Sequence, residues 1–190
     1  MQLRLIAATL VILASAARAH PTLEQPAGVA GKSYKAVFRI AHGCGASPTR
    51  EIEVDIPSGV RGARPMPKPG WQLVAERAQL QSPYTSHGRR VTEDTVRVRW
   101  TARSVDDMLP NAHYDEFVIM VVLPDLPGPV YWPLRQVCEQ GRTDWVNVPL
   151  LGRESSSVKD PAPLLQVMPQ ARPTMSPAHS SGAIHAPAAP

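Results

Sequence analysis

Strict alternation of apolar and polar side chains constrains the fold of this chain more than any other feature. It recurs in residues 33–40, 50–56 and 95–100, where every second side chain is apolar. A period of two places those side chains on one face of a β-strand. Residues 117–123 read FVIMVVL and are apolar at every position. This run predicts a central strand that is covered on both faces.

Proline and glycine separate the alternating runs. Turn-forming clusters occupy residues 57–59 and 67–70, and shorter runs at residues 71–76, 131–138 and 144–148 are further predicted strands. No segment shows a helical period with caps. The sequence therefore predicts an all-β protein, an antiparallel β-sandwich of immunoglobulin or cupredoxin type.

The first nineteen residues have the pattern of a secretory signal. Arg4 precedes an apolar run, Leu5–Ala14, and Ala17 and Ala19 are small residues at the positions that a signal peptidase reads. About ten apolar residues are too few to cross a bilayer, and no later run is long enough. We expect residues 1–19 to be removed and the chain to be periplasmic or secreted, with no membrane span.

The charge balance of the exported chain excludes one class of function. Without Arg4 and Arg18 it has 18 basic and 16 acidic side chains. No basic cluster interleaved with aromatic residues occurs, so nucleic-acid binding is not expected.

The two cysteines, Cys44 and Cys138, predict one disulfide because the chain is expected to reach an oxidising compartment. The alternative is a pair of thiolate ligands for a metal. A blue-copper site is not supported, because neither cysteine is followed closely by the histidine and methionine that such a site uses.

Composition divides the exported chain into a domain, residues 20–151, and a tail, residues 152–190. The tail is rich in proline, alanine and serine and shows no periodicity, so we expect it to be disordered. Thioether and imidazole groups are candidate Cu(I) ligands, although a solvated linker is the alternative. The tail residues that carry them are Met168, Met175, His179 and His185.

Cleavage after Ala19 would leave His20 as the first residue. Its α-amine and its imidazole Nδ1 together form one chelate, and nitrogen ligands of this kind suit Cu(II). Pro21 has no amide proton, so a deprotonated amide at the second position cannot join the site. The alternative is an ordinary frayed end.

Four ordered motifs add a resemblance to this argument. They read AHPTLEQPAGVAGKSYKAVFRIAHGC, PMPKPGW, HYDEF and QVCEQGRTDWVNVP, and together they span about residues 20–150. The chain resembles the YcnI-like family of exported copper-binding proteins. That resemblance implies a β-sandwich in which the amine and ring of the first histidine, together with a carboxylate, bind Cu(II) beside a tryptophan.

The resemblance assigns roles to particular residues. The histidine corresponds to His20, the tryptophan to Trp145 and the carboxylate to Glu24, although core packing is the alternative for Trp145. Four residues of straight strand span about 13 Å. The segment must therefore bend, or Glu116 supplies the carboxylate unless it is only a surface charge. His42 either approaches the metal or holds its loop by a hydrogen bond, and we favour the second.

The predicted function is capture and transfer of copper, without catalysis, and the expected partners are another periplasmic copper chaperone or a membrane copper transporter. One alternative is a copper oxygenase that acts on polysaccharides. It needs a second histidine, from His42, His87 or His113, and exposed aromatic residues, which are scarce here. Another alternative is a β-sandwich interaction module with incidental metal binding. Motifs of zinc hydrolases and serine hydrolases are absent from the sequence.

Overall fold

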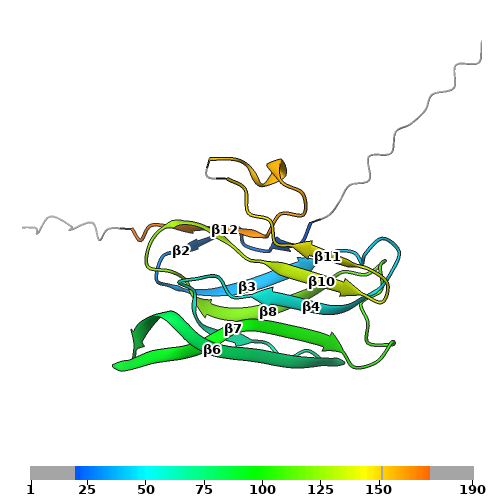
Figure 1. Cartoon of the computed structure of the whole chain (residues 1–190), viewed down its shortest axis with the longest axis horizontal. Helices are drawn as coiled ribbons and strands as arrows, with labels where there is room; N and C mark the ends of the chain where they lie inside the picture. The colour runs from blue at the N-terminus through cyan, green and yellow to red at the C-terminus, as the bar shows by residue number, and fades with distance from the viewer. Residues whose placement is uncertain (1–19, 151, 172–190) are drawn as a thin grey trace, which may run out of the picture.

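The computed structural model describes residues 20–150 and 152–171, and in this part of the chain the strands form three sheets (Figure 1). The four-stranded sheet has the order β1 (Thr22–Leu23), β3 (Ser33–Ile40), β8 (Asp115–Val122), β5 (Arg61–Pro65). The five-stranded sheet has the order β11 (Arg142–Trp145), β10 (Leu134–Cys138), β4 (Thr49–Asp55), β7 (Arg89–Ala102), β6 (Trp71–Ser86). The three-stranded sheet has the order β2 (Ala27–Val29), β12 (Leu164–Met168), β9 (Gly128–Tyr131).

The predicted all-β sandwich is confirmed. Within the described residues the only helical element is the single turn η1 (Ser155–Ser157), and it is too short to cross a membrane. All paired strands are antiparallel except β2 and β12. The predicted signal segment, residues 1–19, lies outside the described part of the chain, as do Met175, His179 and His185.

The core lies between the two larger sheets and is built from the alternating runs. β8 pairs with β3 on one side and β5 on the other, so the apolar run is a central strand as predicted. Phe117 of β8 makes edge contacts with Trp100 and Trp71, at ring-centroid distances of 5.4 and 5.1 Å. All three rings are buried. Burying each one contributes on the order of 2–3 kcal/mol, and these contacts fix how the two sheets face each other.

The predicted strand at residues 131–138 is wrong in one respect, because the structure splits it. β9 ends at Tyr131 and β10 begins at Leu134, and the two strands belong to different sheets. Pro133 between them has no backbone N–H to donate to a ladder. Its carbonyl accepts a hydrogen bond from Asp55 N (2.9 Å) and so starts the pairing of β10 with β4.

The predicted boundary at residue 151 is also wrong. Residues 152–171, which composition assigned to a disordered tail, contain η1 and β12. Leu165 and Val167 of β12 are fully buried in the core. Figure 1 shows β12 (orange) beside β2 (blue), with which it pairs in parallel, while its other edge pairs with β9. In β12 buried and exposed side chains alternate over only five residues, and prolines and serines surround them. The composition of this region therefore did not predict a strand.

Candidate metal centre

A disulfide joins the loop after β3 to the end of β10. Cys44 and Cys138 are bonded, with their Cα atoms 5.9 Å apart, as the sequence predicts. Neither sulfur is then a thiolate, which excludes the alternative of a cysteine metal pair. The bond attaches the loop that carries His42 to the sheet that carries Trp145.

The same loop can form only with glycine at position 43. A Cβ atom there would lie 1.8 Å from the carbonyl oxygen of Ser47, which is far inside van der Waals contact. Cys44 and Ser47 exchange two backbone hydrogen bonds of 3.2 Å, and Gly43 N donates to Asn111 Oδ1 (2.9 Å). The loop around His42 is therefore held closely on both sides.

One buried amide connects this loop to the tryptophan. Gln136 Nε2 donates to the carbonyl oxygen of His42 (2.6 Å) and to Thr49 Oγ1 (2.8 Å). Its Oε1 accepts a longer hydrogen bond from Trp145 Nε1 (3.4 Å). An unpaired polar group would be costly at this depth, so these bonds fix both the loop and the indole.

The structure brings His20 and Trp145 together. Their ring centroids are 5.0 Å apart and their planes are inclined by 70°, an edge contact. Thr22 pairs with Arg39, so the chain before β1 runs past the end of β3 towards the His42 loop. His20 is exposed and Trp145 is 3% exposed. Trp145 thus packs in the core, as the alternative role expects, and its ring also lies against His20.

A groove of about 940 Å³ opens next to this ring pair. It lies between the His42 loop, the end of β11 and residues 159–160, and its lining includes Trp145, Asp144 and Asp160. Asp144 accepts a hydrogen bond from Arg142 (2.9 Å). Neither aspartate could be predicted from the sequence, because only the folded chain places residue 160 beside β11. Asp144 directly precedes the motif tryptophan, which is the one local signal that pointed to it.

The structure gives both predicted carboxylates contacts with other residues. Glu24 N donates to the carbonyl oxygen of Val37 (3.0 Å), which continues the pairing of β1 with β3. The charge of Glu24 instead acts on Tyr34, whose pKa is raised to about 12 by burial first and Glu24 second.

Glu116 belongs to a cluster with Arg39 and Tyr114 on the outer face of the four-stranded sheet. It lies opposite Arg39 in the register of β3 and β8 and accepts a hydrogen bond from the Tyr114 hydroxyl. Arg39 Nε donates to the same hydroxyl (3.1 Å), and this bond is the main cause that raises the pKa of Arg39. The residues described here contain no group of three His, Cys, Asp or Glu side chains that would hold a metal ion.

The remaining predicted residues are placed as follows. His42 Nδ1 lies 2.5 Å from the carbonyl oxygen of Gly43, in keeping with the expected loop-holding hydrogen bond. His87 and His113 are exposed, and His87 forms the β6–β7 turn with a φ of 49°. Met168 ends β12, where its carbonyl accepts a hydrogen bond from Ala30 N (2.9 Å).

A family model for a domain of unknown function, DUF1775, matches residues 20–167. The chain belongs to this family. The match begins at His20 and ends inside β12, so it includes the strand that composition assigned to the tail. No curated protein matches the chain.

A solved structure shares the fold. It is a crystal structure of an uncharacterized protein from Nocardia farcinica, described as revealing an immunoglobulin-like fold. It is 24% identical to this chain over 78% of this chain and 97% of that chain, with a TM-score of 0.58. The chain therefore has an immunoglobulin-like β-sandwich fold.

The exposed His20 and the carboxylates of the adjacent groove are candidate ligands for a metal ion. After removal of residues 1–19, His20 would contribute an amine and an imidazole nitrogen, and nitrogen pairs suit copper. The buried indole of Trp145 packs against the ring of His20. The groove that Trp145 borders is lined by both polar and apolar groups, and it includes carboxylates of the kind that bind divalent cations.

Proposed function

We propose that the mature chain is an exported copper-binding protein, the YcnI-like kind within this family, which captures Cu(II) at His20. The observation that carries the proposal is the edge contact of 5.0 Å between His20 and the buried Trp145 at the rim of the groove. From there the ion passes to a periplasmic copper chaperone or a membrane copper transporter. Copper is the cargo, and catalysis is not part of the proposal.

The surroundings of His20 support this role. Trp145 is fixed by Gln136, and the facing loop is fixed by the disulfide and by Gly43. A first residue that is otherwise free to fray thus has a rigid wall to pack against, which lowers the entropy cost of ordering it around an ion. Its exposure leaves the bound ion accessible to a partner protein.

The groove also suggests where a carboxylate ligand comes from. Asp144 and Asp160 already line it, next to Trp145. Glu24 can join the site only if residues 20–24 bend when the ion binds, which would break the hydrogen bond from Glu24 N to Val37. We therefore expect a groove aspartate to contribute before Glu24 or Glu116.

The polysaccharide oxygenase is the less favoured function. Enzymes that attack a flat sugar surface use exposed aromatic side chains. All four tryptophans of this chain are buried, and the exposed Tyr114 is engaged with Arg39 and Glu116. A binding role leaves these rings in the core, where they stabilise the sandwich.

A Cu(II) titration of the chain that begins at His20, followed by tryptophan fluorescence, tests the proposal. We expect one equivalent of copper to quench the emission, because Trp145 lies beside the site. H20A should weaken binding at least about tenfold, roughly 1.4 kcal/mol, whereas the matched control H113A changes another exposed histidine and should bind normally.

Three outcomes would contradict the proposal. Equal affinity of H20A and H113A would place the copper elsewhere, and no stoichiometric binding would favour an interaction module. Peroxide-driven oxidation of a polysaccharide by the copper-loaded chain would favour the oxygenase instead.

A further inference from the structure

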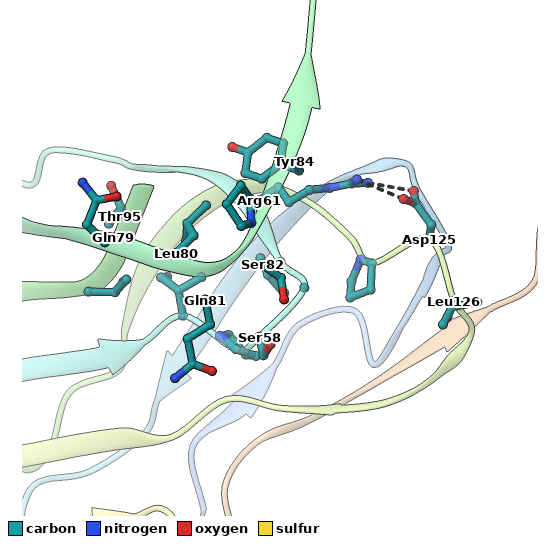
Figure 2. Close-up of a pocket in the computed structure, with 17 residues that line it drawn as sticks. Ser58, Arg61, Gln79, Leu80, Gln81, Ser82, Tyr84, Thr95, Asp125 and Leu126 are labelled. Carbon is teal, nitrogen blue, oxygen red and sulfur yellow. Dashed lines mark hydrogen bonds and ion pairs between the residues drawn. The ribbon is translucent and has the colours of Figure 1, made fainter. Parts of the chain in front are cut away.

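A second groove lies at the opposite side of the five-stranded sheet. Its volume is about 700 Å³, within the range of ligand-binding clefts. Three segments form its walls: residues 56–61, which run from the end of β4 into β5, residues 79–84 of β6, and residues 124–126 after β8. Thr95 and Val96 of β7 complete the lining. Figure 2 shows these segments facing one another, with Leu126 on the loop across from β6.

A bulge in β6 creates this groove. Gln79 pairs with Glu93 and Tyr84 pairs with Val91, so four residues of β6 lie opposite one residue of β7. The extra residues push β6 out of the ladder and away from the sheet. Bulges that are held in place are usually functional features of a sheet.

Hydrogen bonds and an ion pair hold the walls of the groove. Arg61 binds both carboxylate oxygens of Asp125 (2.9 and 2.7 Å), and this pairing lowers the pKa of Asp125. The Arg61 guanidinium lies 5.7 Å from the centre of the Tyr84 ring. Tyr84 in turn donates to the buried Asp94 (2.7 Å), which also accepts from Gly62 N. The three walls are therefore fixed before anything binds.

The lining favours an uncharged, proline-containing peptide. Its apolar part consists of one tyrosine, the kind of aromatic side chain on which polyproline II segments dock, together with prolines and aliphatic side chains. It includes Pro57, Pro83, Pro124, Tyr84, Leu80 and Leu126. Leu126 is 81% exposed, so an occupant of the groove would cover it. Arg61 and Asp125 neutralise each other, so the groove presents no net charge to an occupant.

The described chain ends beside this groove. Gln170 Nε2 donates to the carbonyl oxygen of Ala30 (2.9 Å). A Cβ placed on Gly31 would lie 3.1 Å from that Nε2 and 2.9 Å from Asp125 Oδ1, so Gln170 and Asp125 flank one glycine. Figure 2 shows the orange end of the chain passing close to Leu126.

Residues 172–190 have the length and composition to fill the groove. Nineteen residues in polyproline II form reach about 59 Å, much farther than the neighbouring loop. The segment contains four prolines and five alanines, no acidic residue, and Arg172 as its only charged side chain. Because the segment is tethered, its effective concentration at the groove is in the millimolar range. Even a segment with low intrinsic affinity would therefore occupy the groove in most molecules.

We propose that the groove between the β6 bulge and residues 124–126 binds the chain's own C-terminal segment, residues 172–190, as an extended proline-containing peptide. This groove borders the edge strand β6, whereas the His20 groove borders the other edge strand, β11. Docking holds Met175, His179 and His185 at the edge of the sheet opposite Trp145. The proposal does not depend on copper binding, and its test uses copper-free protein.

The test measures backbone ¹⁵N order parameters of residues 172–190 in the full exported chain. L126D places a charge in the groove, and L150D makes the same change at a leucine that is 78% exposed and lies outside both grooves. We expect order parameters above roughly 0.7 in the central part of the segment for the wild type and L150D. In L126D they should fall below about 0.6, the range of a flexible chain.

Three results would overturn the proposal. Order parameters below about 0.6 in the wild type would show that the segment does not dock. Equal values in L126D and L150D would show that it docks elsewhere. Groove resonances that shift with protein concentration in a chain ending at residue 171 would assign the groove to a second copy.

Discussion

Replacing Leu165 with alanine tests whether β12 belongs to the folded domain. Leu165 is 0% exposed and lies in the core cluster, whereas Leu164 on the same strand is 36% exposed. Removing a fully buried leucine side chain costs about 2–5 kcal/mol, through lost burial and the cavity that remains. The same change at Leu164 removes little buried area and should cost less than about 1 kcal/mol.

Urea unfolding followed by tryptophan fluorescence measures both changes. Trp132 is a suitable reporter because its side chain is buried and its backbone N–H donates to the carbonyl oxygen of Pro163 (2.9 Å), just before β12. With a slope of about 1–3 kcal/mol per molar urea, a difference of about 2 kcal/mol should lower the midpoint of L165A by roughly 1 M relative to L164A. Free energies of unfolding within about 0.5 kcal/mol of each other would refute the assignment of β12 to the core.

Three further predictions follow from the same contacts. Q136L should lower the free energy of unfolding by about 1–3 kcal/mol in urea titrations and weaken Cu(II) binding, because Trp145 Nε1 loses its acceptor; unchanged copper affinity would contradict it. The Cys44–Cys138 bond joins residues 94 positions apart, and its reduction should lower the free energy of unfolding by about 4–5 kcal/mol. An unchanged free energy after reduction would show that the bond does not form. The pKa of Tyr34 is raised to about 12 in the folded chain, from about 10 in an unfolded one. The contribution of Tyr34 to the free energy of unfolding is therefore complete below about pH 10 and is lost as the pH rises through the folded pKa. Y34F should therefore lose less stability than the wild type between these pH values, as alkaline urea titrations would show.

The central sheets could be predicted from the sequence because their pattern is local. Alternation identified β3, β4 and β7, and the uninterrupted apolar run identified β8 as central. Cysteine count together with expected export predicted the disulfide. In each case the chemistry that decides the structure lies within a few neighbouring residues or in a single pair.

Elements that depend on distant partners could not be predicted in this way. β5 reads RGARP and has no apolar alternation, and it is a strand because it pairs with β8. β12 is short and surrounded by prolines, and it is a strand because β2 and β9 lie on both sides of it.

The candidate site shows the same difference between local patterns and contacts with distant parts of the chain. The resemblance brought His20 and Trp145 together, and the structure places their rings in contact. The acidic residues of the groove are different. Asp160 joins Asp144 only through the path of the chain between β11 and β12, which no local motif encodes. Glu24, four residues after His20, is held by a backbone hydrogen bond to Val37 of β3.

The most direct test of the account compares Cu(II) affinity for two proteins that differ by one residue. One chain begins at His20, and the other retains Ala19 before it. The extension converts the α-amine of His20 into an amide and leaves its ring and Trp145 unchanged. The account predicts at least a tenfold loss of affinity, roughly 1.4 kcal/mol or more, in a competition titration. Equal affinity of the two chains would contradict a copper site built on the first residue.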